Sequence, residues 1–164
     1  MSPQSAILRA IEPDAPRRQT FCGYCGHRPE VQPEPEARVC TECELGLLLT
    51  ADEGLSPARD EAFLVVDAGL SIRALSKAAE KLFAIVEIDV VDQPLENVLV
   101  PAESSDDARG KLNRLLSGAA HEPLTAREPD LVVVRPAREF GVRYRARVGR
   151  CEPGRSALVV LAKL

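Results

Sequence analysis

The stretch CGYCGHRPEVQPEPEARVCTEC, residues 22–43, decides how the first third of this 164-residue chain folds, because it places four cysteines in two pairs. Cys22 and Cys25 form one CxxC pair, and Cys40 and Cys43 form the other, with fourteen residues between the pairs. Two residues between thiols let both sulfurs of a tight turn face one ion. Two such turns complete a tetrahedral shell of four thiolates. We therefore predict a structural Zn²⁺ site with these four cysteines as ligands.

The residues around the two pairs favour a small module held together by the metal, a zinc ribbon. Gly23 and Gly26 lie in and just after the first pair, where backbone amides must turn toward the sulfurs. The spacer 27–39 carries three prolines and three glutamates, and it has few apolar side chains for a core. A closed four-thiolate shell leaves no position for water or substrate. The metal is therefore expected to stabilise the fold and not to catalyse.

Other uses of the cysteines stay open at this point. Disulfides need an oxidising compartment, and residues 1–20 lack the basic start and long apolar stretch of a secretory signal. Redox chemistry of the thioredoxin type would place one CxxC after a strand, not among Gly, Pro and Glu. Iron suits the same cage, and CGYCG is similar to a rubredoxin knuckle, although only Phe21 and Tyr24 are aromatic nearby. His27 is an alternative ligand. Zinc bound by the four thiolates is the preferred interpretation.

Composition and charge narrow the class of protein. Hydrophobic residues make up 45% and charged residues 28%, as in ordinary globular proteins, and no apolar run approaches the length of a bilayer. The net charge is −4, with five Arg against seven acids in residues 1–50 and 16 basic residues against 18 acids in the remainder. Neither part has the excess of basic residues that binds phosphates, so nucleic-acid binding is not expected. We expect a cytoplasmic protein without membrane contact. Seventeen Arg against four Lys is a usage common in GC-rich bacterial genomes.

The chain is expected to divide into four parts: an N-terminal extension (1–20), a zinc ribbon (21–50), a linker (51–61) and a second domain (62–164). The linker is polar and contains Gly54 and Pro57, which mark a boundary. Just before it, four leucines need cover by a neighbouring element: Leu45, Leu47, Leu48 and Leu49. If nothing covers them, they form an interaction surface.

From residue 62 onward the pattern predicts two strands, two helices and three strands. Residues 62–66 and 70–75 are rich in β formers and join at a turn over 67–69, which indicates a hairpin. Ser76 precedes one helical pattern, and Ser104 with Asp107 precedes another. Three strand-like segments follow at 131–134, 141–148 and 157–161. In the second of these, three arginines alternate with apolar residues: Arg143, Arg145 and Arg147. This pattern predicts either an anion or partner site, or a sheet face that is solvated or salt-bridged to acids on neighbouring strands.

This order of elements and its local motifs resemble a PAS domain across about residues 61–164. Asp67 at the end of the first strand and Ser76 at the start of the first helix match family positions, whereas Asp92 stands where a glycine is usual. The resemblance implies an α+β fold: a PAS-like five-stranded antiparallel sheet with helices on one face, here preceded by the zinc ribbon. It also implies a cavity between sheet and helices, and frequent homodimerisation through the other face or a flanking helix.

The resemblance implies a sensory or scaffolding role. We expect a non-catalytic signalling or regulatory module, a PAS-like sensor or protein-interaction domain whose cavity accepts an unidentified small apolar ligand. Family members that bind flavin photochemically carry a cysteine motif in the helical region, whereas Cys151 lies near the last strands. A haem ligand would have to be His121, at a helix end. In an alternative hypothesis, the protein is a transcription regulator whose zinc ribbon contacts DNA or the transcription machinery. No motif for catalysis is present, so an enzyme is not expected.

Overall fold

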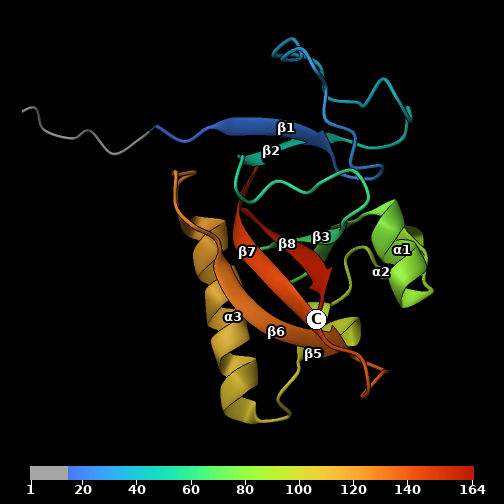
Figure 1. Cartoon of the computed structure of the whole chain (residues 1–164), viewed down its shortest axis with the longest axis vertical. Coiled ribbons are helices and arrows are strands. Elements are labelled where there is room, and N and C mark those ends of the chain that lie inside the picture. The colour runs from blue at the N-terminus through green and yellow to red at the C-terminus, as the bar shows by residue number, and fades with distance from the viewer. Residues whose placement is uncertain (1–14) are drawn as a thin grey trace, which may run out of the picture.

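The computed structural model describes residues 15–164, and its framework is one antiparallel sheet (Figure 1). The expected N-terminal extension, residues 1–20, lies largely outside the described residues. The strands are β1 (Arg18–Cys22), β2 (Leu48–Asp52), β3 (Ala62–Asp67), β4 (Ile72–Leu75), β5 (Leu99–Pro101), β6 (Asp130–Pro136), β7 (Tyr144–Glu152) and β8 (Ser156–Lys163). They run in the order β1-β2-β7-β8-β3-β4, and β6 pairs with both β7 and β5.

The helices gather around the part of the sheet formed by the second half of the chain. They are α1 (Lys77–Phe83), α2 (Glu87–Val90), the 3₁₀ turn η1 (Leu95–Asn97) and α3 (Asp106–His121). In Figure 1, α3 lies at the lower left, α1 and α2 lie at the right, and the β1–β2 hairpin lies at the top. Alternate residues of β3, such as Leu64 and Val66, face the helices in one large buried cluster, in which Leu116 of α3 is fully buried. The expected α+β class with helices on one face is confirmed.

The expected number of five strands is wrong, because the sheet has eight. Five strands lie side by side as the resemblance implied, in the order β4-β3-β8-β7-β6. The short β5 adds to β6, and the β1–β2 hairpin adds to β7, where Thr50 lies opposite Glu152 and Ala51 opposite Cys151. The hairpin belongs to the stretch expected to be a self-contained ribbon. Its unpaired strand edge extends the sheet because backbone N–H and C=O groups need partners.

The helix starts follow from side-chain caps. Ser76 caps α1, because its hydroxyl accepts from the N–H of Ala79 at 3.1 Å, and it also accepts from Phe63 of β3 at 3.0 Å. One buried hydroxyl thus joins the first helix to the sheet. For α3 the expected cap, Ser104, is wrong by one residue: Ser105 has extended backbone and accepts from Ala108. Asp92, at the position where the family has glycine, takes φ 65°, a left-handed conformation that aspartate tolerates.

The face of the sheet opposite the helices carries the β1–β2 hairpin. Phe21 of β1 meets Phe63 of β3 edge to face, with ring centroids 5.5 Å apart and an interplanar angle of 89°. Both rings are fully buried, in a second apolar cluster with Leu55, Cys151 and Leu158. Leu55 comes from the segment 53–61, which crosses this face after β2. The first third of the chain therefore shares an apolar core with the sheet of the second half.

Within the described residues, no helix combines the length and the hydropathy that a membrane span needs.

Candidate metal centre

The four predicted cysteines meet in one cluster. Their sulfur atoms all lie within 4.8 Å of one another, with Cys22 Sγ 3.6 Å from Cys43 Sγ and Cys25 Sγ 3.9 Å from Cys40 Sγ. A tetrahedral Zn²⁺ with metal–sulfur bonds of about 2.3 Å separates its ligands by about 3.8 Å. The cluster therefore has the dimensions of a four-thiolate zinc site. Cys22 and Cys40 are buried, whereas Cys25 and Cys43 are partly open to solvent.

Backbone N–H groups surround the sulfurs. Tyr24 and Cys25 each donate to Cys22 Sγ at 3.4 Å, and Gly46 donates to Cys43 Sγ at the same distance. The turns at Cys22–Cys25 and Cys40–Cys43 are called knuckles below. They are joined through Gly23, whose N–H donates to the carbonyl of Leu47 at 2.8 Å. Such donors stabilise negative charge on sulfur, which a thiolate ligand carries even when bound. The backbone thus stabilises the negatively charged sulfurs that a cation needs as ligands.

The pKa values of the thiols indicate which sulfurs still carry a proton that a bound metal must displace. Burial raises the pKa of Cys22 to about 12 and also raises that of Cys25. Burial opposes ionisation of Cys43 too, but hydrogen bonds from the backbone of Gly46 and Leu45 outweigh it and lower its pKa to about 7. At neutral pH without metal, at least Cys22 and Cys25 therefore keep their protons. A Zn²⁺ ion bound by all four sulfurs would replace these protons and supply structural stability.

Zinc affinity should fall steeply as the pH falls. Protons and metal compete for the same sulfurs, and at least two protons, those of Cys22 and Cys25, must leave when zinc binds near neutrality. The stability supplied by the metal is thus present at high pH and lost on acidification. We expect the affinity to drop by about 100-fold or more between pH 7 and pH 6. Competition with a chromophoric chelator across this range measures it, and a pH-independent affinity would contradict the four-thiolate assignment.

Gly46 was not singled out from the sequence, although the structure shows that only glycine fits there. A Cβ at this position would press against Cys22 Sγ and lie 2.9 Å from Tyr24 Cβ. The signal in the sequence is its place three residues after Cys43, at the end of the second knuckle. A glycine at this point lets the backbone of one knuckle pass directly beside a ligand of the other.

Gly46→Ala should abolish tight zinc binding, because the added methyl group forces the two knuckles apart. The matched control is Gly118→Ala in α3, where a Cβ meets nothing within 4 Å and where alanine favours the helix by about 0.5–1 kcal/mol. Elemental analysis after gel filtration against a weak chelator gives the zinc content per chain. Equal zinc in both variants would show that the contact with Cys22 does not shape the site.

The alternative ligand His27 does not join the cluster, which among the described residues consists of the four cysteines. Its backbone carbonyl accepts from the N–H of Cys22 at 2.9 Å, so it supports the knuckle through the main chain. Cys151 is fully buried and burial raises its pKa to about 12, as expected of a packed apolar residue. His121 is exposed at the end of α3, with Nδ1 2.7 Å from the carbonyl of Ser117.

Tyr24 connects the metal centre to the first helix of the second half. Its carbonyl accepts from the N–H of Lys77, the first residue of α1, at 2.8 Å, and its hydroxyl donates to Glu80 at 3.1 Å. Glu80 in turn accepts from the N–H of Glu87 at 2.8 Å, and Glu87 accepts from the N–H of Leu75 in β4 at 3.0 Å. Burial raises the pKa of Glu87. The chain of contacts runs from the knuckle to α1, α2 and the sheet, and no motif in the sequence indicated it.

The leucines after the second knuckle divide into two groups. Leu49 packs against the shared apolar cluster, and Leu48 is partly buried. Leu45 and Leu47 keep 75% and 61% of their surface exposed, and Val39 beside them keeps 49%. Val39 and Leu47 are bridged across the two arms of the ribbon. These three exposed apolar residues therefore lie on the surface of the segment that carries the cysteine cluster.

Arg145 and Arg147 of β7 lie on the face away from the helices, as predicted, while Tyr144, Ala146 and Val148 are buried against the helices. The expected strand over 141–148 starts later, at Tyr144, so Arg143 precedes it and lines a hollow beside α3. Arg147 forms an ion pair with Glu61 at 2.8 Å and donates to the carbonyl of Gly54 at 3.2 Å. For this arginine, the interpretation as a salt-bridged sheet face is confirmed.

Fold and site together define a class: an α+β protein with an antiparallel sheet covered by helices on one face and an attached four-thiol centre suited to a metal. No protein-family model and no curated protein matches the chain. Among solved structures, the chain is similar to the PAS domain of nitrogen regulation protein NR(II) from Vibrio parahaemolyticus. The sequence identity is 24% and the TM-score 0.44, covering 64% of this chain and 90% of that chain. A likeness of this size says nothing about ligand, partner or activity.

Proposed function

We propose that the chain is a non-catalytic signalling or regulatory module that acts through protein contacts, with its zinc ribbon serving as part of the contact surface. The observation that supports this proposal is the packing of the β1–β2 hairpin, which flanks the four cysteines, against the sheet. β2 pairs with β7, and Phe21 packs on Phe63. A metal bound there fixes the shape of a surface. The exposed patch of Val39, Leu45 and Leu47 lies on that surface.

The packing between sheet and helices supports protein interaction over ligand sensing. Side chains of the sheet and of α3 fill this region with exposures near zero, among them Leu64, Ile72, Leu116 and Val148. A small apolar ligand at this place would have to displace packed side chains. Its binding remains a prediction. The proposal therefore does not depend on a ligand.

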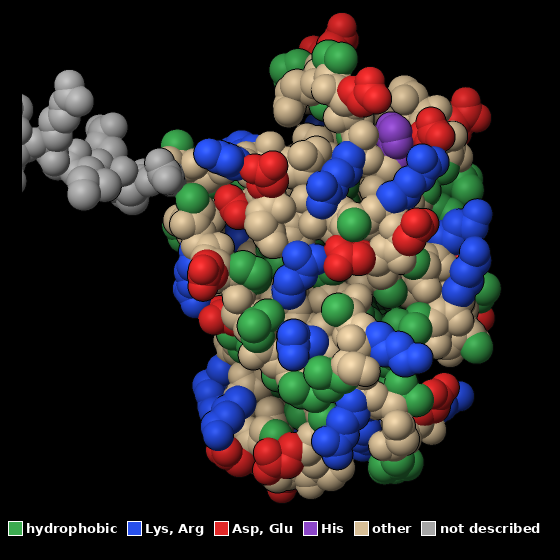
Figure 2. Space-filling model, viewed as in Figure 1, with side chains coloured by type: hydrophobic (Ala, Val, Ile, Leu, Met, Phe, Trp, Pro, Cys, Tyr) green, Lys and Arg blue, Asp and Glu red, His purple; other side chains and the backbone are tan. Residues whose placement is uncertain are grey.

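The charge around the cysteines supports a protein partner and not DNA. Residues 17–52 carry four arginines and six acidic residues, and four thiolates around one divalent ion add two further negative charges. Figure 2 shows acidic side chains among the basic ones at the upper end of the molecule, where the hairpin lies. A DNA-binding ribbon needs an excess of Lys and Arg for phosphates. The alternative of a transcription regulator that grips DNA through the ribbon is thus less well supported.

The experiment compares three zinc-loaded proteins by cross-linking mass spectrometry in extract of the source cells: wild type, Leu45→Ser/Leu47→Ser, and the control Ile88→Ser. Ile88 is 84% exposed on α2 and does not line the hollow that Leu45 and Leu47 share. The proposal expects one protein that wild type and control enrich at least about tenfold over the double variant. Equal enrichment by all three would contradict it. Salt-sensitive binding to a random 20-base-pair duplex would favour the DNA-binding alternative.

A further inference from the structure

A hollow of about 640 Å³ lies between the cysteine segment and the sheet, and both parts line it. Leu45 and Leu47 line it from the ribbon, whereas Arg73 of β4 and the turn 153–155 between β7 and β8 line it from the second half of the chain. Its apolar lining includes side chains of the core that the two parts share: Leu49, Val65, Ala74 and Cys151. This hollow, called the ribbon hollow below, therefore exists only while the ribbon is held against the sheet.

Leu47 connects the ribbon hollow to a second hollow, of about 820 Å³. The two hollows share Leu47 and the turn 153–155, and the second one also takes its lining from β2 and from the spacer between Gln32 and Arg38. Leu45 and Leu47 are 75% and 61% exposed. Exposed apolar side chains gathered at a concave surface mark places where another molecule binds. The two hollows thus form one candidate contact surface.

Two arginines without an ion-pair partner belong to this surface. Arg155 lines both hollows, and Arg38 lines the second one. Both side chains are exposed, and neither forms an ion pair with any residue between 15 and 164. A carboxylate supplied from outside can pair with either arginine without breaking a contact inside the chain.

The other charged side chains of the ribbon hollow already have partners. Arg73 pairs with Asp92 at 2.7 Å. Asp67 and Glu87 accept hydrogen bonds from backbone N–H groups at distances between 2.9 and 3.0 Å. Arg155 is therefore the charge of this hollow that is left to recognise a partner.

The second hollow has the same sign of free charge. Glu152 pairs with Arg18 at 2.7 Å, and Arg150 donates to a backbone carbonyl at the end of α3. Glu34 is an exposed carboxylate without an ion pair among the described residues. Across both hollows, two free arginines thus stand against one free carboxylate, which favours a partner with acidic side chains.

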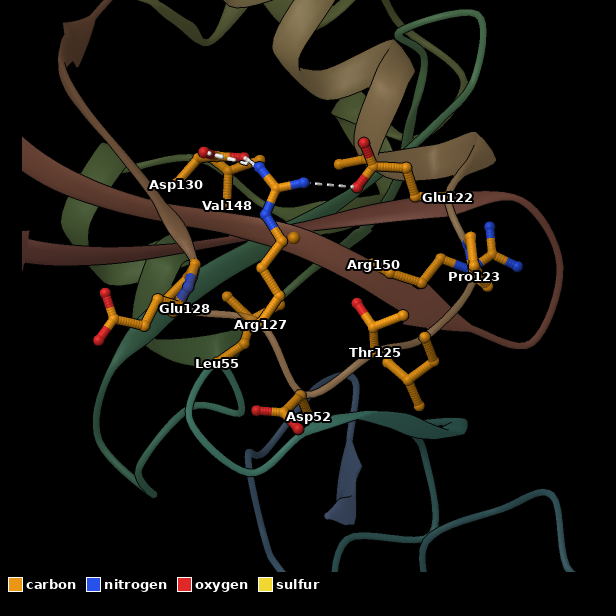
Figure 3. Close-up of a pocket in the computed structure, with 14 residues that line it drawn as sticks. Asp52, Leu55, Glu122, Pro123, Thr125, Arg127, Glu128, Asp130, Val148 and Arg150 are labelled. Carbon is orange, nitrogen blue, oxygen red and sulfur yellow. Dashed lines mark hydrogen bonds and ion pairs between the residues drawn. The ribbon is translucent and has the colours of Figure 1, made fainter. Parts of the chain in front are cut away.

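A third hollow, at the end of α3, shows the opposite arrangement (Figure 3). It holds only about 30 Å³, and Arg127 beside it donates to Glu122 at 3.0 Å and to Asp130 at 2.9 Å. This arginine is satisfied within the chain, and the space is too small for a side chain from outside. The ribbon hollow differs in both respects.

We propose that the ribbon hollow binds a segment of another protein in which apolar side chains stand next to aspartate or glutamate. The inference rests on the proposed function, because it names the partner of the same surface. The apolar side chains occupy the space beside Leu45, Leu47 and Ala74, and the carboxylates pair with Arg155 and Arg38. Burial of the apolar groups supplies most of the affinity, and the arginines select acidic segments over basic ones.

A nucleic acid suits this surface less well. Its phosphates would use the two arginines but would leave Leu45 and Leu47 exposed. The composite lining also makes binding depend on the metal, because the ribbon contributes its share only while the four cysteines are held together. Removal of zinc should therefore abolish the binding of the segment.

Selection from a random peptide library displayed on phage, with the zinc-loaded full chain as bait, tests the proposal. The enriched peptides should contain apolar residues next to Asp or Glu. One of them, labelled with a fluorophore, is titrated by fluorescence anisotropy. Arg155→Glu should weaken its binding at least about fivefold, because the attraction becomes a repulsion. Ala74→Phe, which fills the hollow without a change of charge, should weaken it as much. The control Arg145→Glu reverses an exposed arginine outside both hollows and should have no effect.

An exchange of charges separates recognition from damage to the fold. A peptide whose acidic residues are replaced by lysine should bind Arg155→Glu more tightly than it binds the wild type. Circular dichroism and zinc content establish that each variant is intact. If Ala74→Phe does not fold, Arg155→Glu and the lysine peptide decide the question.

Several results would overturn the proposal: no enriched sequence, enriched peptides without acidic residues, equal binding to Arg155→Glu and the wild type, or binding that survives removal of zinc. Enriched peptides that match a stretch of this chain would identify its own segment or a second copy as the occupant and would also overturn it. In the cross-linking comparison above, a partner lost by Leu45→Ser/Leu47→Ser but kept by Arg155→Glu contradicts this inference and leaves the proposed function in place.

Discussion

Removal of the metal by a strong chelator should open the backbone amides of residues 18–52 to hydrogen exchange while residues 62–163 stay folded but less stable. The four sulfurs hold the two knuckles together, and the spacer between them has almost no core of its own. Without the metal, Phe21 and Leu49 no longer stay fixed over the sheet, and Phe63, Val65 and Leu158 lose their cover. The cost to the remaining structure is about 2–4 kcal/mol in free energy of unfolding, the equivalent of uncovering one or two large side chains.

Hydrogen exchange with mass spectrometry, together with thermal unfolding, measures both effects. Re-addition of Zn²⁺ should restore protection and melting temperature, whereas Mg²⁺, which prefers oxygen ligands, should not. Two results would count against the interpretation. If residues 62–163 lose protection together with the ribbon, the division into a metal-held part and an independently folding part fails. If nothing changes, the cysteines hold no metal that matters for stability.

Phe63→Ala should lower the free energy of unfolding by about 3–5 kcal/mol, the largest effect expected of a single side chain outside the metal centre. Phe63 is fully buried between the sheet and the hairpin and meets Phe21 edge to face. Its removal leaves a cavity that the paired strands around it cannot close. Phe140→Ala is the control, because Phe140 is 76% exposed and only stacks on Arg135, at 4.3 Å. That change should cost less than about 1 kcal/mol.

A double-mutant cycle between Phe21 and Phe63 identifies how much of this effect belongs to the seating of the ribbon. Edge-to-face aromatic pairs contribute about 0.5–1.5 kcal/mol beyond the area they bury. A coupling energy in this range, measured by urea unfolding, is expected. Additive effects of Phe21→Ala and Phe63→Ala would mean that the two rings do not interact in solution.

The cysteine cluster was predictable from the sequence because the chemistry of four thiolates around one ion restricts the spacing of its ligands. Two CxxC pairs therefore indicated a meeting point that the structure reproduces to within a few ångströms. The caps and alternations were nearly as informative: Ser76 lies where it was expected, and Arg145 and Arg147 of β7 share one face. In these cases a local rule and the final fold agree.

What the sequence did not reveal depends on contacts between distant segments. Nothing in residues 48–52 indicates that their strand adds to β7, because the match of Thr50 with Glu152 is a matter of backbone groups and not of side-chain type. The link from Tyr24 to Glu80 spans 56 positions and uses residue types that are common on any surface. The pairing of β2 with β7 and the contact of Tyr24 with α1 were therefore visible only in the structure.

The pairing of β2 with β7 has a consequence for the way the chain is made. About a hundred residues separate the two strands, and β3 likewise pairs with a strand far along the chain, β8. Contacts so distant along the chain form late. On the ribosome, the cysteine hairpin can bind its ion as soon as it emerges, but it can pair with the sheet only after β7, residues 144–152, has also emerged. Until then the side chain of Phe21 is exposed to solvent, and we expect chaperones to bind a nascent chain in this state.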